Sequence, residues 1–455
     1  MSSNSSYVAA VDIGTTKIVT LVGRLNDNGK MEVLGMSKTV SKGVKRGVVL
    51  NIEETVNAIR ETVEETQQQS GLKLSDVYVG IAGQHIKSIK NRGYINIGPD
   101  RDEILQKDID ALIRDMKNIP IDMGEEIIHV LPQNYIVDNE AGVKNPVGMS
   151  GRRLEANFHI VVGQILSAKN IERCINRVNL TVNQLVLEPL ASSAAVLSTD
   201  EKEAGVALVD IGGGTTDIAV FYDDVIRHTA VIPFGGNVVT RDIKEGCSIL
   251  QRQAEALKKQ FGSALGDLAP EDKVVTIPGI SGREPKEISF KSLAYIIQSR
   301  MEEIIDAVMY EIENSGCMDK LSAGIVLTGG GALLQHLSQL VKFRTGMDVR
   351  IGFPGESLAS GSAEELNQPM YSTSIGLLIK AAEFKQKEPF VAADEVVDDT
   401  NFKVEQRKTK TEEKNNTFSD ETKESKDSKE QSGKMLNTFM KRIGDMFEDR
   451  GASME

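Results

Sequence analysis

Two stretches of this chain repeat one another about 200 residues apart, and this repeat constrains the fold more than any other feature. Residues 8–22 read VAAVDIGTTKIVTLV, and residues 206–221 read VALVDIGGGTTDIAVF. Each copy is an apolar run ending in Asp, a turn of Gly and Thr, and a second β-rich run, which predicts a β-hairpin. Two such hairpins indicate a duplicated architecture with a cleft between similar halves.

Apolar strands alternate with helical patterns up to about residue 385. Residues 206–209 and 325–328 are typical of buried strands, whereas residues 52–65 and 296–312 have the periodicity of helices. This alternation predicts an α/β protein. A chain of 455 residues is long enough for about two to four domains with a sizeable core.

The composition changes sharply near residue 386. Residues 386–433 are nearly half charged and lack apolar periodicity, so we expect a disordered linker. Residues 434–455 are periodic again, with apolar side chains on one helical face opposite lysines and an arginine. This pattern favours a helix in the membrane interface over one that docks on the protein or a partner. The apolar face comprises Met435, Leu436, Phe439, Met440, Ile443, Met446 and Phe447.

Charge and cysteine content exclude several classes of protein. The formal net charge of −13 argues against nucleic-acid binding, which needs clustered cations. Cys174, Cys247 and Cys317 lie far apart without metal-ligand spacing, so we expect no disulfide framework and favour a reducing compartment. We see no signal peptide and no apolar run of the roughly 18 residues that span a bilayer, so we expect a cytoplasmic protein.

The turn of the first hairpin has the side chains that suit a phosphate chain with Mg²⁺: Asp12, Gly14, Thr15, Thr16 and Lys17. The glycine lets backbone N–H groups approach an anion, the hydroxyls and the amine can meet phosphate oxygens, and Asp12 can hold the ion through water. An ordinary tight hairpin with Asp and Thr in turn positions is an equally good interpretation of this turn alone.

The turn of the second hairpin strengthens the phosphate interpretation. Three consecutive glycines cost conformational entropy and have no side chains to pack, so close approach of the backbone to an anion explains them better than a turn does. Together the two turns predict a phosphate site in which Asp12 and Asp210 hold Mg²⁺ through water. The residues of the second turn are Asp210, Gly212, Gly213, Gly214, Thr215 and Thr216.

A third glycine cluster, Gly329, Gly330 and Gly331, follows the apolar strand at 325–328. We expect a helix directly after it, with three leucines, at 333, 334 and 337, on its apolar face. Glycines at such a turn let a ribose or a flat ring lie against the backbone, although a tight strand–helix connection is the alternative. The cluster matches neither the P-loop nor the Rossmann fingerprint.

Two further segments carry candidate residues. Glu188 precedes a proline and an alanine-rich helix start, where its carboxylate can orient an attacking water, although such a Glu is usually an ordinary strand-end residue. Glu255 and Lys258 share one face of a predicted helix, for which a solvated salt bridge is the simpler interpretation. The five histidines have no ligand spacing, and no Ser/His/Asp or Cys/His arrangement is visible.

The motif order DIGTTK, EP, DIGGGTTD, AE-x-x-K and LTGGGA resembles that of the actin-like ATPase superfamily, which includes actin, sugar kinases and heat-shock-type chaperones. Within it, the chain is similar to the FtsA family of bacterial cell-division proteins. Supporting stretches are KRGVVLNIE at 45–53, VYVGIAGQHI at 77–86 and an insert from about residue 85 to 162. The resemblance covers about residues 7–385 and the terminal helix.

The resemblance implies a fold and a set of boundaries. The fold is a duplicated actin-like α/β fold of two ribonuclease-H-like halves with inserted α+β subdomains, then a linker and an amphipathic helix. The implied parts are subdomain 1A (7–84 and 163–200), inserted 1C (85–162), 2A (201–228 and 305–385), 2B (229–304), the linker (386–433) and the membrane-targeting helix (434–455).

The resemblance also assigns roles to the motifs. The two turns would be the phosphate loops for ATP with Mg²⁺, and Gly329–Gly331 would be the adenosine turn. Glu188, in the water-orienting place, and Asp210 would be catalytic residues, while Glu255 and Lys258 would lie on the nucleoside side. Family members often turn ATP over slowly, so ATP binding with weak ATPase activity at most is expected.

The implied function is that of a polymerising scaffold. The protein would self-associate into filaments on the inner face of the cell membrane, tether the FtsZ ring through subdomain 2B and recruit later septum proteins. An actin-like scaffold of pilus or secretion machinery is the closest alternative. A small-molecule kinase would have no use for a tethered amphipathic helix, and a heat-shock-type chaperone would need a peptide-binding β-domain.

Overall fold

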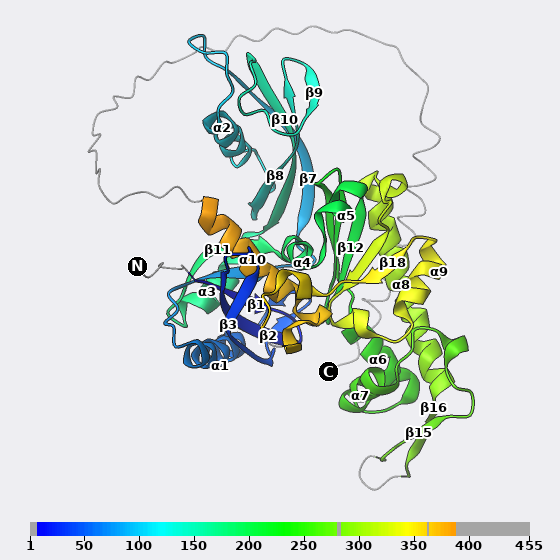
Figure 1. Ribbon diagram of the computed structural model, residues 1–455. Helices are drawn as coiled ribbons and strands as arrows, with labels where there is room; N and C mark the ends of the chain where they lie inside the picture. The colour runs from blue at the N-terminus through cyan, green and yellow to red at the C-terminus, as the bar shows by residue number, and fades with distance from the viewer. Residues whose placement is uncertain (1–6, 280–283, 362–363, 388–455) are drawn as a thin grey trace, which may run out of the picture. The chain divides into compact units, whose positions relative to one another are not determined.

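The computed structural model describes residues 7–279, 284–361 and 364–387 of the chain (Figure 1). The predicted membrane helix at 434–455, and nearly all of the predicted linker before it, lie outside the described residues. The described part is mixed α and β, which confirms the α/β class. None of the helices in these described ranges is long and apolar enough to cross a membrane.

The first repeat forms the centre of a five-stranded sheet. Strands β1 and β2 form the predicted hairpin, because they pair antiparallel from Val8 and Gly23 to Ile13 and Ile18. Strand β3 continues antiparallel beside β2, whereas β6 and β11 join the other side of β1 in parallel. In sheet order the strands are β11 (Thr181–Leu187), β6 (Asp76–Ile81), β1 (Val8–Ile13), β2 (Lys17–Leu25) and β3 (Met31–Val40).

The second repeat forms the centre of another five-stranded sheet. Strands β12 and β13 are its hairpin, β14 continues antiparallel beside β13, and β17 and β18 follow on the other side of β12 in parallel. In sheet order the strands are β14 (Val225–Ile232), β13 (Thr216–Tyr222), β12 (Val206–Ile211), β17 (Ile325–Thr328) and β18 (Val349–Ile351).

The two sheets therefore have the same topology, which confirms the duplication expected from the repeat. In both hairpins the last paired residues, Ile13 with Ile18 and Ile211 with Thr216, enclose four residues. Asp12 and Asp210 each lie one residue before the turn, at the end of a fully buried strand. The registers thus place the two aspartates at equivalent positions of the two halves.

Helices α1 (Ile52–Ser70) and α3 (Ile165–Asn176) pack on one face of the first sheet. α1 extends beyond the predicted residues 52–65. It begins after Asn51, whose side chain accepts a hydrogen bond from the N–H of Glu54, and ends at Gly71 in the left-handed conformation. Between β3 and α1, the strands β4 (Val44–Lys45) and β5 (Val48–Val49) form a short hairpin.

Helices α4 (Glu188–Val196) and α10 (Ser372–Lys387) belong to a core that both halves share. Leu21 of the first sheet and Leu208 of the second are fully buried in this core, together with Leu378 of α10. α4 thus lies between the two sheets (Figure 1). Burial of apolar surface from both halves on the same two helices holds the halves together.

The second half has its own core, formed by helices packed on β12, β13 and β17. α8 begins at Phe290, earlier than the predicted residue 296, because Ser289 caps it. The remaining elements of this half are α5 (Thr199–Ala204), α6 (Gly236–Cys247), α7 (Gln251–Phe261), β15 (Val274–Ile277), β16 (Lys286–Ser289), α8 (Phe290–Ser315) and α9 (Leu337–Thr345).

An insert between β6 and α3 forms a separate α+β layer (Figure 1). Its antiparallel sheet has the order β7-β10-β8-β9, and α2 covers one face through buried residues such as Leu112, which lies in the same core as Phe158. The elements are β7 (Lys87–Asn96), α2 (Gln106–Met116), β8 (Glu125–Val137), β9 (Glu140–Val143) and β10 (Arg153–Gln164).

The insert also contacts the second half, at the edge strand β14. The hydroxyl of Thr229 lies 2.9 Å from both Nε2 of His159 and Oγ of Ser88. Lys144 forms an ion pair with Asp223, in the turn before β14, at 2.7 Å. The insert therefore contacts both halves of the duplicated fold.

Candidate functional site

The two glycine-threonine turns lie against each other. A Cβ on Gly213 would overlap the side chain of Thr16, and a Cβ on Gly214 would overlap that of Thr15. The glycines of the second turn therefore leave room for the threonines of the first, a role in addition to the predicted approach of an anion. The structure brings the two predicted turns into one place from opposite halves.

The backbone of the first turn is closely packed, and its side chains form hydrogen bonds with neighbouring segments. A Cβ on Gly14 would lie 2.9 Å from the carbonyl oxygen of Lys17, and Thr15 Oγ1 accepts a hydrogen bond from the N–H of Gly47 at 3.1 Å. Lys17 donates to the carbonyl of Met370. Burial lowers the pKa of Lys17, whereas the charges of Asp12 and Asp210 act to raise it.

The second turn is held by its own backbone and by the residues that follow. The N–H of Gly212 donates to the carbonyl of Thr215 at 2.9 Å, and Thr216 Oγ1 donates to the carbonyl of Phe234 at 2.9 Å. The hydroxyl of Thr215 donates to Asp217 at 3.0 Å. These hydrogen bonds fix the conformation of the turn that contains the glycines.

Asp12 and Asp210 are both buried and both accept hydrogen bonds from hydroxyl groups. Ser374 donates to Oδ2 of Asp12 at 2.5 Å. Ser192 and Thr373 donate to Oδ2 of Asp210 at 2.6 and 2.9 Å. Burial raises the pKa of both carboxyls, while these hydroxyls favour the charged forms and act against that rise.

The charges of this pair act on two more carboxyl groups. Glu188, the first residue of α4, is partly exposed; burial first, and then the charges of Asp12, Asp217 and Asp210, raise its pKa well above the usual value. Asp217 is buried opposite Asp210 in the β12–β13 register. Burial and the charge of Asp210 raise the pKa of Asp217 to about 8.

This cluster fits a divalent cation bound through water. Oδ1 of Asp217 is buried and has no hydrogen-bond partner among the described residues. In the described ranges, Lys17 is the cation whose charge favours the ionised Asp12 and Asp210. The same ranges hold no cluster of three or more His, Cys, Asp or Glu side chains that could ligate a metal directly. The chemistry of the site therefore suits a hydrated Mg²⁺ that balances buried negative charge.

The third glycine cluster lies beside the second turn. Gly329 has a positive φ of 80°, and a Cβ there would overlap Oδ1 of Asp210. A Cβ on Gly331 would overlap Ile211, whereas one on Gly330 would meet nothing nearer than 4.0 Å. The cluster thus abuts the aspartate-bearing end of β12 and leaves space above Gly330.

The helix expected directly after this cluster does not form there. A 3-10 turn spans Gly330–Leu333, and α9 begins only at Leu337. Leu333 is 47% exposed, so it does not lie on a buried helix face. The reason is that Gln335 pairs instead with the segment after α7, where the N–H of Ala264 donates to its carbonyl at 2.8 Å.

Glu255 and Lys258 form a partly buried salt bridge. Their charged groups lie 2.8 Å apart on α7, and Lys258 also donates to Thr240 Oγ1 at 2.8 Å and to the carbonyl of Gly236 at 2.9 Å. The N–H of Gly236 donates in turn to the carbonyl of Gly212 at 2.9 Å. The pair is therefore connected to the second turn through the first turn of α6.

Comparisons with known proteins identify the family. The family model described as cell division protein FtsA matches residues 207–376, and a model of the SHS2 domain inserted in FtsA matches residues 83–162. The FtsA protein of Pseudomonas aeruginosa is 41% identical over 376 residues, covering 83% of this chain and 89% of its own length. That of Escherichia coli K12 is 35% identical over 384 residues, covering 83% and 90%.

The chain belongs to the FtsA family. Solved structures show the same actin-like fold for this FtsA-family chain. A PilM–PilN type IV pilus biogenesis complex matches with a TM-score of 0.59 at 13% identity, covering 83% of this chain and 99% of the other. MreB5 of Spiroplasma citri matches with a TM-score of 0.52 at 14% identity, covering 84% and 98%. At these identities the likeness is one of fold.

Sequence reasoning missed several residues of this FtsA-family site. Asp217 stands inside the DIGGGTTD motif, and the hairpin register that this motif predicts could have placed it opposite Asp210. Ser192, Thr373 and Ser374 donate to the two aspartates but carry weaker signals. The run Tyr-Ser-Thr-Ser at 371–374 is that signal, since consecutive hydroxyls beside a buried helix start need partners.

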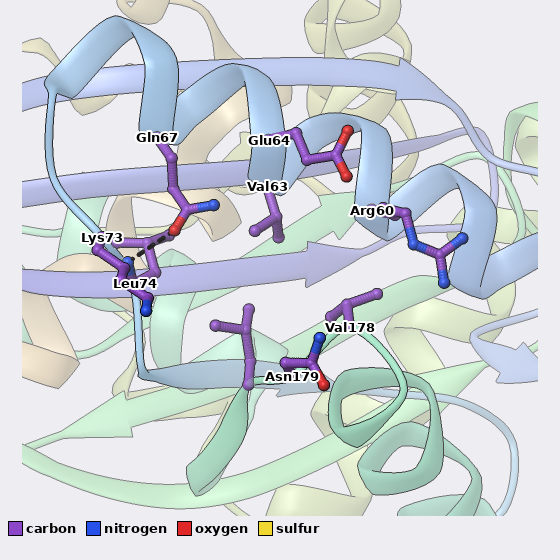
Figure 2. A pocket seen from close by; sticks show the side chains of 9 residues that line it. Arg60, Val63, Glu64, Gln67, Lys73, Leu74, Val178 and Asn179 are labelled. Carbon is purple, nitrogen blue, oxygen red and sulfur yellow. Dashed lines mark hydrogen bonds between the residues drawn. The ribbon is translucent and has the colours of Figure 1, made fainter.

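A separate cavity of about 250 Å³ lies away from these motifs, between α1 and residues 178–180 (Figure 2). Val63, Leu74 and Val178 form its apolar part. Two of its polar side chains have local partners: Gln67 accepts from the N–H of Leu74 at 2.9 Å, and Arg60 donates to a neighbouring asparagine. None of the predicted site residues lines it.

Proposed function

We propose that this FtsA-family protein binds ATP with Mg²⁺ between its two halves and polymerises on the inner face of the cell membrane. There it tethers the FtsZ ring and helps to recruit later septum proteins. Membership of the FtsA family supports the role in cell division. The MreB5 structures with this fold contain ADP and AMPPNP, which supports nucleotide binding.

The observation that carries the nucleotide proposal is the convergence of four carboxyl groups and two glycine turns from both halves. In this proposal the backbone and threonines of the two turns, with Lys17, hold the phosphates. Asp12 and Asp210 hold hydrated Mg²⁺, which neutralises phosphate charge when bound. The orphaned oxygen of Asp217 supports a water or ion beside Asp210.

The remaining motifs are assigned to the nucleoside and to the attacking water. Gly329–Gly331 receive the adenosine beside the space above Gly330, and Glu255 and Lys258 contact the nucleoside from α7. Glu188 is the most exposed of the four carboxyls and orients the water, with Asp210 as the second catalytic residue. Burial and the neighbouring carboxylates raise the pKa of Glu188, so its ionised form is a stronger base toward that water than an ordinary glutamate.

The subdomain division is proposed in the form that the resemblance implies. The first half and the insert correspond to 1A and 1C, and the second half to 2A and 2B, with FtsZ bound on 2B at residues 229–304. The match of the SHS2 model to residues 83–162 supports the insert boundaries. The apolar face from Met435 to Phe447 attaches the protein to lipid as a peripheral membrane protein at the septum.

Self-association strengthens membrane attachment in this proposal. One amphipathic helix of seven large apolar residues binds lipid reversibly, because helix ordering offsets much of the gain from burial. Several helices on one filament bind far more tightly, since each further contact is effectively intramolecular.

The test is co-sedimentation of the full chain with vesicles and FtsZ. We expect wild type to bind labelled ATP in the presence of Mg²⁺ and to bring FtsZ into the vesicle pellet. A chain ending at residue 433 should still bind ATP and FtsZ but should stay in the supernatant. Retained vesicle binding by the shortened chain contradicts the anchor, and lack of FtsZ binding by wild type contradicts the division role.

The pilus-scaffold alternative receives less support. The PilM–PilN complex shares 13% identity with this chain and so supports only the fold, whereas the FtsA proteins share 35–41%. The same FtsZ pull-down separates the two, because a pilus scaffold has no reason to retain FtsZ. A phosphotransfer assay over small substrates separates the kinase alternative.

A further inference from the structure

Five consecutive residues, 370–374, contact all three glycine motifs or the strand ends directly beside them. Lys17 of the first turn donates to the carbonyl of Met370, and its ammonium lies 4.3 Å from the ring centroid of Tyr371. The next three residues, at the start of α10, are all hydroxyl-bearing. Each of them contacts a different strand of the site.

The three hydroxyls divide their hydrogen bonds between the three glycine motifs. Ser372 Oγ lies 2.6 Å from Thr328 Oγ1, directly before Gly329. Thr373 donates to Asp210, which is separated from the second turn only by Ile211. Ser374 donates to Asp12, which is separated from the first only by Ile13. One helical turn therefore contacts β17, β12 and β1 at the ends where their glycine turns begin.

Burial gives these bonds a large effect on carboxylate orientation. Ser372 and Ser374 are 0% exposed, and Asp12 and Asp210 are 5% and 6% exposed. A buried carboxylate that loses a donor has no water to replace it and turns toward another partner. The hydroxyls of α10, together with Ser192 of α4 at Asp210, thus hold the two aspartates in their orientation.

We propose that Thr373 and Ser374 are positioning residues that hold Asp210 and Asp12 in the orientation required for Mg²⁺-dependent nucleotide binding. This inference rests on the proposed function, because it concerns the same site. The pair differs from ordinary helix-start hydroxyls in that each side chain reaches an aspartate of a different half. One turn of α10 therefore contacts both aspartates, and Ser192 of α4 is the second donor to Asp210.

The test is binding of labelled ATP to the full chain, with Mg²⁺ and with a chelator. We expect Thr373→Val and Ser374→Ala each to reduce the Mg²⁺-dependent gain in affinity by about tenfold, because each removes a hydrogen bond to a buried charge. Affinity without Mg²⁺ should change by less than about twofold. Thr373→Ser keeps the hydroxyl and should bind as wild type does.

Ser193→Ala is the matched control. Ser193 is also buried on a helix of the shared core, but its hydroxyl donates to the carbonyl of Leu190 and not to an aspartate. This variant should keep the full response to Mg²⁺. If it loses the response as Thr373→Val does, the effect comes from the shared core in general and the inference is overturned.

A double-mutant cycle separates positioning from a merely structural role. If Thr373 acts through Asp210, Thr373→Val should add nothing to the Mg²⁺ response of Asp210→Asn. If the double variant loses more of the Mg²⁺-dependent gain in ATP affinity than Asp210→Asn alone, the inference is overturned. It is also overturned if the single variants Thr373→Val and Ser374→Ala keep the full gain of wild type. If Thr373→Val fails to fold, Ser374→Ala with Asp12→Asn gives the same cycle. Wild type that does not bind ATP overturns the proposed function as well.

Discussion

The imidazole of His129 accepts a hydrogen bond from the backbone N–H of Leu187, and the two nitrogen atoms lie 3.0 Å apart. His129 lies on β8 of the insert, whereas Leu187 ends β11 and directly precedes Glu188. The insert therefore reaches the residue before the proposed water-orienting carboxylate. Because Nε2 accepts this bond, the ring is neutral in the folded protein.

This buried histidine predicts a loss of stability in mild acid. Burial first, and then the charges of Lys380 and Lys117, lower the pKa of His129 to about 4. An unfolded chain takes up a proton near pH 6.5, so stability present above that pH is lost as the pH falls from about 6.5 to 4. His159, whose pKa is also about 4, contributes a second loss in the same range.

Urea unfolding at pH 7 and pH 5 measures this effect. We expect His129→Gln to lose about 2 kcal/mol less than wild type between these two pH values, since glutamine can accept the same bond without titrating. The variant is expected to keep the N–H of Leu187 paired and so to fold at pH 7. Equal losses in the two proteins contradict the prediction.

The contact between the insert and β14 predicts a second stability effect. Thr229 is 5% exposed and its hydroxyl lies within hydrogen-bond distance of His159 and Ser88. Thr229→Val should lower the free energy of unfolding by about 1–3 kcal/mol, because it leaves buried polar groups unpaired. Thr229→Ser should recover most of this loss. If Thr229→Val is as stable as wild type, this contact contributes nothing to the free energy of unfolding.

The third glycine cluster offers a matched pair of variants. Gly329→Ala should destabilise the protein and weaken ATP binding, because φ is 80° and a Cβ would overlap Asp210. Gly330→Ala meets nothing nearer than 4.0 Å and should keep the unfolding midpoint of wild type. Thermal unfolding measured on both variants tests this. Equal lowering of the two unfolding midpoints contradicts the geometric explanation.

The contacts of Thr240 predict that its replacement weakens recognition of the nucleoside. The Thr240 hydroxyl accepts a hydrogen bond from Lys258 and donates one to Glu255, so its replacement removes a partner from each charged group. Thr240→Val should reduce the preference for ATP over inorganic tripolyphosphate by about fivefold or more, since the phosphate turns stay intact. Thr240→Ser is the control and should keep the preference. If the affinities for ATP and for tripolyphosphate fall equally, Thr240 acts on the phosphate side of the site instead.

The hairpins were the most predictable part of the fold. Their apolar alternation and Gly-Thr turns are local features, and the structure has the two strand pairs in equivalent registers. The α/β class and the duplication followed from the same pattern. Helix ends were less predictable, because Ser289 and Gly71 fix them by capping rather than by apolar periodicity. The helix expected after Gly331 was wrong, since pairing of Gln335 with a distant segment competes with it.

The amino-acid sequence by itself determined where Asp12 and Asp210 stand, because strand alternation and the turn place each at the end of a buried strand. Only the tertiary structure decided what holds them. Ser374 and Asp12 are 362 positions apart, and Thr373 and Asp210 are 163 apart. Burial of α10 in the core shared by both halves brings these hydroxyls to the aspartates, and a long-range contact of this kind leaves no periodic pattern in the chain.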